Sequence, residues 1–472
     1  MRDRSPEPGA GRRLRSTPGA RRRRRLAGTG AVLLLAAAAA HAAWPVIWDY
    51  DGRSDQPVAA ALAPGGDLVV LVEAWAQGAS APCGVLLRIG PDGQVAWATP
   101  DCELTGPTGL ALAGDGRALA LSRVGGNLRV TAFTATGAID WSRTRAGLVP
   151  ETPFMGPAAQ PVWDAAAAAW RIPAGLGSDF AVLSWNAVGD PLPDLLWTPP
   201  AGDAVATAVA PRPGGGVVVS GWVDLTVPGW WVVALDAAGV EAWRRFEDGG
   251  TAAGLFSGAF PVAVDAARVT MWADDETGCG LFSLRLWSLD AATGAPLWAT
   301  TWPDPPACDY FIPDVVRLAG DRILAAGATT VFGGAASPTT AAVSFDAADL
   351  QPVWAREFAG TTNTIRAEVA SAGGAALSAS TLFPPVNPGP TPLWTAAWSR
   401  DGVACGAPVE LLPAYVAASF ADAAGRWLLV GYGAPGTTGS DLLVQLVADP
   451  CTALFRDGFE SGDVSAWSSS VP

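Results

Sequence analysis

The sequence predicts an all-β protein, an eight-bladed β-propeller whose blades are four-stranded antiparallel sheets. Three observations lead to this prediction. Tryptophan recurs after a turn containing glycine or aspartate, at intervals of 44 to 56 residues, which suits one four-stranded blade per repeat. Two short apolar segments precede each of these turns. The 55 glycines and 40 prolines among 472 residues suit many short strands joined by turns and argue against long helices.

The stretch 287–302 shows the repeating unit most clearly. It contains an apolar strand, a turn from Asp290 to Gly294, and a second strand centred on Trp298. Burial of an indole between blades would stabilise the fold by up to roughly 4–6 kcal/mol. We therefore assign the repeated tryptophans to blade packing rather than to a glycan or cofactor platform. The predicted blade-packing residues are Trp48, Trp97, Trp141, Trp197, Trp243, Trp298 and Trp354.

Each unit also has an upstream half, made of two apolar strands and a glycine-containing turn. Residues 58–62 with 68–75, and residues 315–318 with 323–328, are examples. Such runs of Val, Leu and Ala are typical of strands buried on both faces. Counted in this way, eight units begin near Val58, Leu110, Pro157, Val205, Pro261, Pro313, Ile365 and Val416.

The eighth unit has only three strands, because its pattern ends with residues 441–447. A lone strand that carries Trp48 lies at the other end of the chain, over residues 44–48. We expect this N-terminal strand to close the last blade. Pairing the two chain ends removes the two sheet edges that an open ring would expose.

The hairpin turns carry aspartates that could be read as calcium ligands. We interpret them as turn residues, because an aspartate side chain accepts hydrogen bonds from backbone N–H groups two residues further on. These aspartates are Asp92, Asp236, Asp290, Asp346 and Asp401.

Composition divides the chain into three expected parts: a leader (1–42), a propeller domain (43–450) and an acidic tail (451–472). The leader contains a run of arginines at 21–25, an apolar segment at 26–40 and small residues around position 41, which is the order of a secretory signal. The apolar segment is shorter than the roughly 20 residues of a membrane span. We therefore expect no stable membrane span after cleavage, and an exported monomer that is periplasmic, bound at the cell surface or secreted.

The remainder of the chain is acidic. The leader holds 10 of the 30 basic and 2 of the 44 acidic residues, which leaves 20 basic and 42 acidic residues and a formal charge of −22. Such a surface repels nucleic acid, so we expect no nucleic-acid partner.

Six cysteines in an exported chain predict three structural disulfides. Cys83 with Cys102, and Cys279 with Cys308, lie at the open ends of predicted hairpins, where two strands come together. Cys405 and Cys451 are paired by elimination.

No catalytic, cofactor-binding or metal-binding constellation is found in the sequence. The only histidine, His41, lies in the leader, so catalysis by a Ser/His/Asp or Cys/His arrangement is excluded for the rest of the chain. The glycine run at 213–216 lacks the lysine and hydroxyl residue of a phosphate-binding loop. Glycoside hydrolysis by a pair of carboxylates stays an open alternative, because the 42 acidic residues allow many pairings in space.

The turn-and-tryptophan passages that end at Trp97, Trp141, Trp243 and Trp354 resemble the pyrroloquinoline-quinone-type repeats of quinoprotein-like propellers. This family includes eight-bladed quinone-dependent alcohol dehydrogenases and non-catalytic scaffolds. The dehydrogenases use a disulfide between adjacent cysteines, which this chain lacks. The resemblance therefore implies the fold and no cofactor. The end of the chain, 454–467, resembles a short tail of assorted secreted bacterial proteins.

Three functions are compatible with these features. The first is an exported, non-catalytic propeller that binds or scaffolds an unknown protein or glycan ligand. The second is a quinone- or calcium-dependent dehydrogenase or lyase on the same fold, which requires polar side chains that converge at the central funnel. The third is an extracellular glycan-binding propeller that uses exposed tryptophans.

Overall fold

A computed structural model gives the fold of the chain. It describes residues 44–50, 52, 54–75, 81–147, 160–176, 179–200, 203–224, 229–248, 259–277, 281–303, 309–331, 339–357, 364–372, 375–382, 393–411, 415–421, 426–433, 441–447 and 451. Within these ranges, no helix is both long and apolar enough to cross a membrane.

The described residues form 32 strands, which hydrogen-bond into eight four-stranded antiparallel sheets. Seven sheets each take four strands that are consecutive in the sequence. The first four of these sheets contain β2 (Asp55–Leu62), β3 (Leu68–Ala74), β4 (Cys83–Ile89) and β5 (Val95–Asp101); β6 (Pro107–Leu112), β7 (Ala118–Val124), β8 (Asn127–Phe133) and β9 (Ile139–Arg145); β10 (Val162–Asp164), β11 (Ala169–Leu176), β12 (Asp179–Asn186) and β13 (Leu195–Trp197); and β14 (Asp203–Pro211), β15 (Val217–Asp224), β16 (Gly229–Leu235) and β17 (Glu241–Asp248).

The other three consecutive sheets and the closing sheet complete the set. They contain β18 (Phe260–Val264), β19 (Arg268–Thr277), β20 (Leu281–Asp290) and β21 (Pro296–Trp302); β22 (Asp309–Ala319), β23 (Arg322–Val331), β24 (Thr339–Asp346) and β25 (Pro352–Glu357); β26 (Thr364–Ala372), β27 (Ala375–Leu382), β28 (Leu393–Trp398) and β29 (Val409–Leu411); and β30 (Tyr415–Ala421), β31 (Trp427–Gly433) and β32 (Asp441–Val447) with β1 (Val46–Trp48).

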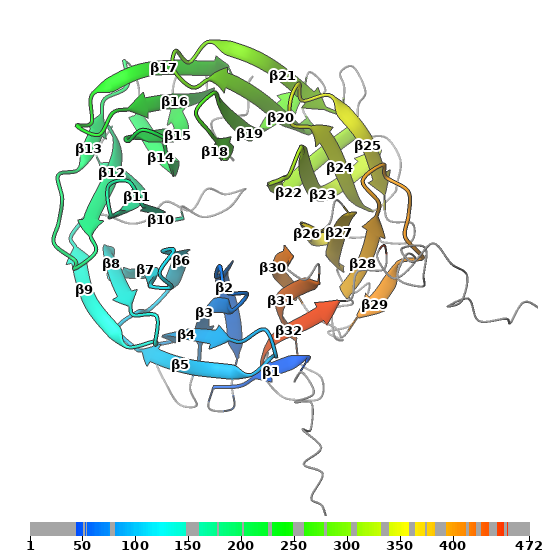
Figure 1. Cartoon of the computed structure of the whole chain (residues 1–472), viewed down its shortest axis with the longest axis horizontal. Helices are drawn as coiled ribbons and strands as arrows, with labels where there is room; N and C mark the ends of the chain where they lie inside the picture. The colour runs from blue at the N-terminus through cyan, green and yellow to red at the C-terminus, as the bar shows by residue number, and fades with distance from the viewer. Residues whose placement is uncertain are drawn as a thin grey trace, which may run out of the picture. The chain divides into compact units, whose positions relative to one another are not determined.

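The sheets stand as blades around a common centre (Figure 1). In each blade the first strand lies nearest the centre and the last lies on the perimeter. The apolar core is divided among the gaps between neighbouring blades. One cluster, for example, joins Leu119 and Trp141 of one blade to Trp170 and Leu183 of the next. Stability therefore depends on contacts between successive blades, as in other repeat proteins.

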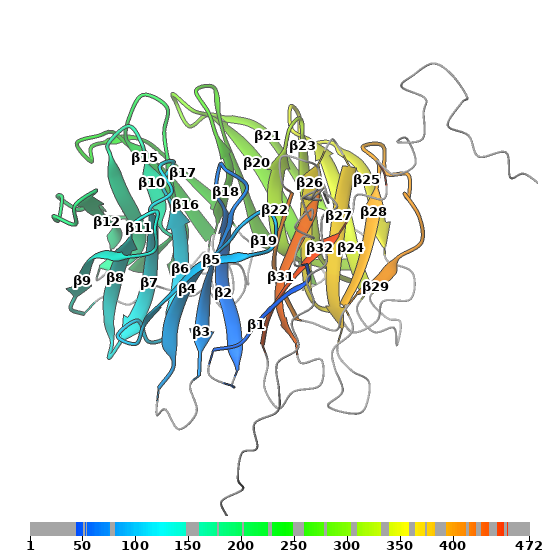
Figure 2. The ribbon, with the colours of Figure 1, turned by 60° about the horizontal axis from the view of Figure 1, so that its bottom comes forward.

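The N-terminal strand closes the ring, as predicted. β1 pairs antiparallel with β32, so that Ile47 lies opposite Leu443 and Trp48 opposite Leu442. The two strands lie side by side in Figure 2. The last blade thus combines the two ends of the propeller, and the N-terminal strand covers the edge of β32 that would otherwise be open.

Tryptophans of the outer strands dock on glycines of the next blade. A Cβ atom built on Gly294 would lie 2.6 Å from the ring of Trp243, and Gly294 has a φ of +69°. The Trp243 indole N–H also donates a hydrogen bond of 2.9 Å to the Ala291 carbonyl oxygen in the same turn. Only a residue without a side chain lets the indole lie this close to the turn backbone. The four docked pairs are Trp97 on Gly137, Trp141 on Gly189, Trp243 on Gly294 and Trp354 on Gly402.

The expectation for Trp298 needs correction, because half of this side chain is exposed, at 50%. The residue at the equivalent turn position of the next blade is Leu350, which is fully buried and has a φ of +60°. The Leu350 side chain occupies this position, so the turn offers no bare backbone on which the Trp298 indole could dock.

Trp197 and Trp48 also depart from the docking pattern. Trp197 is buried, but it packs near Phe180 and Trp231 and donates its indole hydrogen bond to a Glu241 carboxylate oxygen at 2.6 Å. Leu195, two residues earlier, takes the place beside the turn Gly239. Trp48 lies opposite the start of β32, whereas docked tryptophans lie opposite the end of the third strand of their blade. The spacing of tryptophans along the sequence does not distinguish Trp197 and Trp48 from the tryptophans that dock on glycines.

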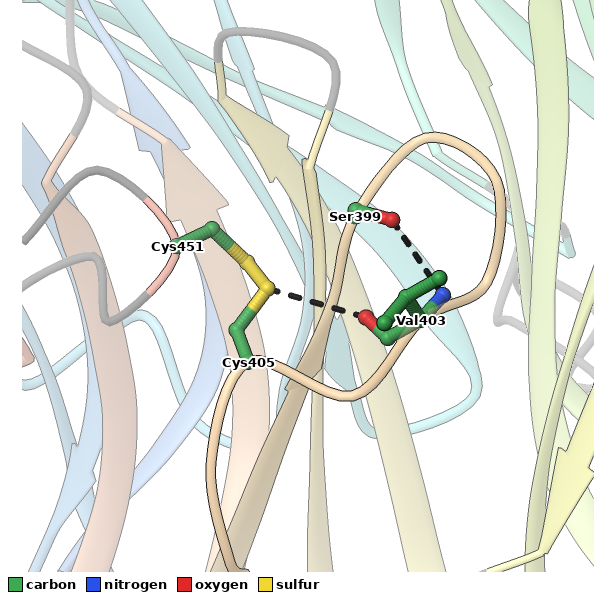
Figure 3. The surroundings of a disulfide bond; sticks show 4 residues. All are labelled: Ser399, Val403, Cys405 and Cys451. Carbon is green, nitrogen blue, oxygen red and sulfur yellow. Dashed lines mark hydrogen bonds between the residues drawn. A yellow bond between two sulfur atoms is a disulfide. The ribbon is translucent and has the colours of Figure 1, made fainter. Parts of the chain in front are cut away.

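Two of the three expected disulfides lie within the described residues, and both are formed. Cys83 and Cys102 are bonded across the open end of the β4–β5 hairpin, with Cα atoms 4.0 Å apart. Cys405 and Cys451 are bonded with Cα atoms 4.9 Å apart and tie the loop after β28 to the end of the last blade (Figure 3). Cys279 and Cys308 lie outside the described residues. The two bonds indicate an oxidising, extracytoplasmic environment.

Four of the five predicted turn aspartates, Asp92, Asp236, Asp290 and Asp346, accept backbone hydrogen bonds within their own turns. The Asp236 carboxylate accepts hydrogen bonds from the N–H groups of Ala238 at 2.9 Å and Val240 at 2.8 Å. Asp290 accepts from Ala292 and Thr293 in the same way. The Asp290 hydrogen bonds hold the turn on which the Trp243 indole docks, and the Asp236 hydrogen bonds hold the turn beside which Leu195 lies.

Gly294→Ala should destabilise the fold by about 1–3 kcal/mol more than Gly147→Ala, because both add a methyl group at a positive φ but only the first collides with an indole. Gly147, with a φ of +72°, has no other atom within 4 Å of its would-be Cβ. Denaturant unfolding of both variants measures the difference. Equal losses would show that the indole does not rest on the turn.

Candidate functional site

The candidate site is an axial cavity of about 460 Å³. Its walls come from seven of the eight innermost strands, which surround the centre in Figure 1. Most of the lining is apolar, with Phe260 and Trp272 the largest side chains. The remaining lining residues are Val58, Ala59, Ala60, Leu110, Gln160, Val162, Thr207, Ala208, Val209, Pro261, Asp314, Val315, Val316, Arg317, Ala417 and Ala418.

A repeated irregularity of the innermost strands shapes this cavity. In seven of the eight blades, the register between the first and second strands shifts by one residue near the start of the first strand. A β-bulge of this kind bends a strand and turns a side chain in a new direction. Four of the extra residues, Val58, Thr207, Asp314 and Ala417, line the cavity.

Four polar side chains among the described residues line the cavity, and two of them form hydrogen bonds with the protein's own backbone. Gln160 accepts a hydrogen bond from the Leu110 N–H at 3.1 Å. Thr207 donates to the Ala259 carbonyl oxygen at 3.2 Å. Asp314 and Arg317 are the charged members, and the Arg317 guanidinium lies 5.5 Å from the ring centre of Phe420. A ligand would therefore meet one negative and one positive group on the same strand, β22.

A second carboxyl group, that of Asp274, lies close enough to Asp314 to interact with it electrostatically. Asp274 is buried on β19, in the blade next to that of Asp314. Burial raises the pKa of Asp274 well above its usual range, and the negative charge of Asp314 raises it further. The raised pKa means that the Asp274 carboxyl retains its proton at pH values where a free aspartate is ionised. A neutral carboxyl can donate a hydrogen bond or a proton.

The residues singled out in the sequence do not form this site. None of the seven predicted blade-packing tryptophans lines the cavity, and neither does any of the four disulfide cysteines within the described residues. Asp274 and Asp314 were missed, although 274–276 is an acidic run in an otherwise apolar strand and Asp314 interrupts the apolar 310–316. The two carboxyls come together only because β19 and β22 belong to neighbouring blades.

Comparisons with known proteins show that this chain resembles several solved structures in its fold. No protein-family model matches the chain, and no curated protein matches its sequence. Among solved structures, quinohemoprotein alcohol dehydrogenase from Comamonas testosteroni matches with a TM-score of 0.54 and 12% identity, over 85% of this chain and 76% of that chain. The enzyme ADHIIG from Pseudomonas putida HK5 matches with a TM-score of 0.47 and 12% identity, over 86% and 75%.

A protein from Lactobacillus plantarum matches with a TM-score of 0.44 and 12% identity, over 80% of this chain and 98% of that chain. The chain is thus a β-propeller that is structurally similar to quinohemoprotein alcohol dehydrogenases at low identity. At this identity the likeness concerns the fold, and fold does not determine chemistry.

The described cavity lining does not fit pyrroloquinoline quinone, the cofactor that this likeness would suggest. The cofactor carries three carboxylates, whereas the described lining offers a single guanidinium, that of Arg317, beside the Asp314 carboxylate. Anionic groups placed against an apolar wall without cationic or hydrogen-bonding partners are costly to bury.

Asp274→Asn should remove a pH dependence of stability. Because the pKa of Asp274 is raised in the fold, the folded state binds more protons than the unfolded state once the pH exceeds about 4. The wild-type protein therefore loses stability as the pH rises above that value, by at most about 1.4 kcal/mol per pH unit, until the folded carboxyl also ionises.

Urea unfolding between pH 4 and pH 8 measures this slope, with Asp140→Asn, on the exposed face of β9, as the control. Asp274→Asn should gain stability relative to wild type as the pH rises, and the control should not. Parallel profiles for the wild type and Asp274→Asn would contradict the assignment.

Proposed function

We propose that the protein is an exported, non-catalytic binding module, and that its axial cavity holds a small, largely apolar molecule with one polar group. The cavity itself carries this proposal. Ligand sites in proteins are typically concave, 300–1,000 Å³ in volume, and apolar with a few polar groups that fix orientation. The volume of about 460 Å³ and the composition of the lining meet that description.

The arrangement of the lining supports a specific orientation for the ligand. Phe260 and Trp272, which are 5% and 3% exposed, contribute a small aromatic surface in one blade, while Asp314 and Arg317 provide the charged groups in the next. An aromatic ring would pack on the first pair and direct its polar substituent to the second pair. The two disulfides support the exported location.

Binding is favoured over catalysis by the few reactive groups that the described lining supplies. General acid–base chemistry on a bound molecule usually requires groups that approach it from more than one side. Here both charged lining residues lie on β22, three positions apart. The similarity to alcohol dehydrogenases adds no catalytic residue to this chain, because it extends only to the fold.

Isothermal titration of the purified full chain with 2-naphthol, a neutral aromatic probe with one hydroxyl group, tests the proposal. We expect a dissociation constant of about 10–100 µM, typical of a ligand of this size. Ala208→Phe, which fills the cavity, should weaken binding at least tenfold, whereas Ala238→Phe on an exposed outer turn should not.

Binding that survives Ala208→Phe, or no binding by the wild-type protein, would contradict the assignment of the cavity. A dye-reduction assay with added pyrroloquinoline quinone and a primary alcohol tests the non-catalytic part separately. Sustained turnover by the pure protein would overturn it.

A further inference from the structure

Three aspartates meet where the ring closes. Asp49 follows β1, Asp55 begins β2, and Asp441 begins β32. One carboxylate oxygen from each lies within 4.8 Å of those from the other two. The three residues therefore join the N-terminal strand, the last blade and the first blade at a single point.

Asp55 is the buried member of this group, with none of its surface exposed. Its Oδ2 accepts a hydrogen bond from the Tyr50 N–H at 2.6 Å. Its Oδ1 is also buried but has no hydrogen-bond partner. No arginine among the described residues forms an ion pair with Asp49 or Asp55. A buried carboxylate oxygen without a hydrogen-bond partner destabilises the folded state unless a cation or a proton neutralises it.

We propose that Asp49, Asp55 and Asp441 bind a calcium ion that fastens the N-terminal strand to the last and first blades. Calcium prefers oxygen ligands at 2.3–2.6 Å and accepts irregular geometry. Two oxygens bound to one such ion are at most about 4.6–5.2 Å apart, and the three carboxylate oxygens, all within 4.8 Å of one another, meet that limit. Asp49 is exposed and provides an entry route from solvent.

The alternative to a cation is a proton on Asp55. Burial raises the pKa of Asp55 to about 7, against the lowering effect of the Tyr50 N–H, and the charges of Asp49 and Asp441 raise it further. The two alternatives differ in a measurable way. Only the first makes the stability of the ring closure depend on calcium at constant pH.

Isothermal titration of the chelator-treated full chain with calcium chloride is the direct experiment. We expect one ion bound per chain, a thermal midpoint that rises with calcium concentration, and a weaker effect of magnesium at the same concentration. Hydrogen exchange at the β1 amide that is bonded to β32 should speed up in chelator, while exchange in β19 should not change.

Substitutions identify the ligands. Asp55→Asn and Asp441→Asn should each weaken calcium binding at least tenfold, and Asp140→Asn should leave it unchanged. Removing one negative charge should leave Asp55→Asn at least as stable as wild type in chelator, which separates lost binding from unfolding. If Asp55→Asn does not fold, Asp49→Asn serves instead, because an asparagine Oδ1 can still accept the Gly52 N–H hydrogen bond that Asp49 receives at 2.7 Å.

No stoichiometric calcium binding by the wild-type protein would overturn the proposal. So would binding that is unchanged in Asp55→Asn or Asp49→Asn.

Discussion

The contact between an outer-strand indole and a bare glycine turn of the next blade determines how the blades fit together. It requires a large flat side chain on one blade and the absence of a side chain on the next, as with Trp141 and Gly189. An indole hydrogen bond to the same turn, from Trp141 to the Ala187 carbonyl oxygen at 3.2 Å, fixes the angle between the two sheets. The contact occurs at four of the eight junctions between blades, where Trp97, Trp141, Trp243 and Trp354 dock. At these junctions it sets how closely the outer strand of one blade approaches the outer turn of the next.

The inner strands supply the side chains that face the axial cavity. A regular strand would direct alternate side chains into the gaps between blades, and the bulges redirect single residues toward the axis. The chain places small or apolar residues at most of these positions and an aspartate at one, Asp314. This choice gives the cavity its one negative lining group and perturbs the buried Asp274 in the adjacent blade. The chemistry of the site therefore depends on one bulge.

Much of the fold could be predicted from the sequence, because the repeats are local patterns. The strands, the turn aspartates and the closing N-terminal strand follow from spacing and from the cost of open edges. The docking of individual tryptophans could not be predicted, since it depends on the residue opposite: Trp243 meets Gly294, whereas Trp298 meets the blade that carries Leu350. Neither the Asp274–Asp314 pair nor the group of Asp49, Asp55 and Asp441 could be predicted from the sequence, because each unites residues from separate blades or chain ends.

The central claim, that an indole resting on a glycine turn holds successive blades together, is tested most directly by a double-mutant cycle between Trp243 and Gly294. If the contact acts as described, an alanine at position 294 becomes much less destabilising once Trp243 is replaced by leucine, with a coupling energy of about 1–3 kcal/mol in denaturant unfolding. Additive effects of the two substitutions would contradict the account.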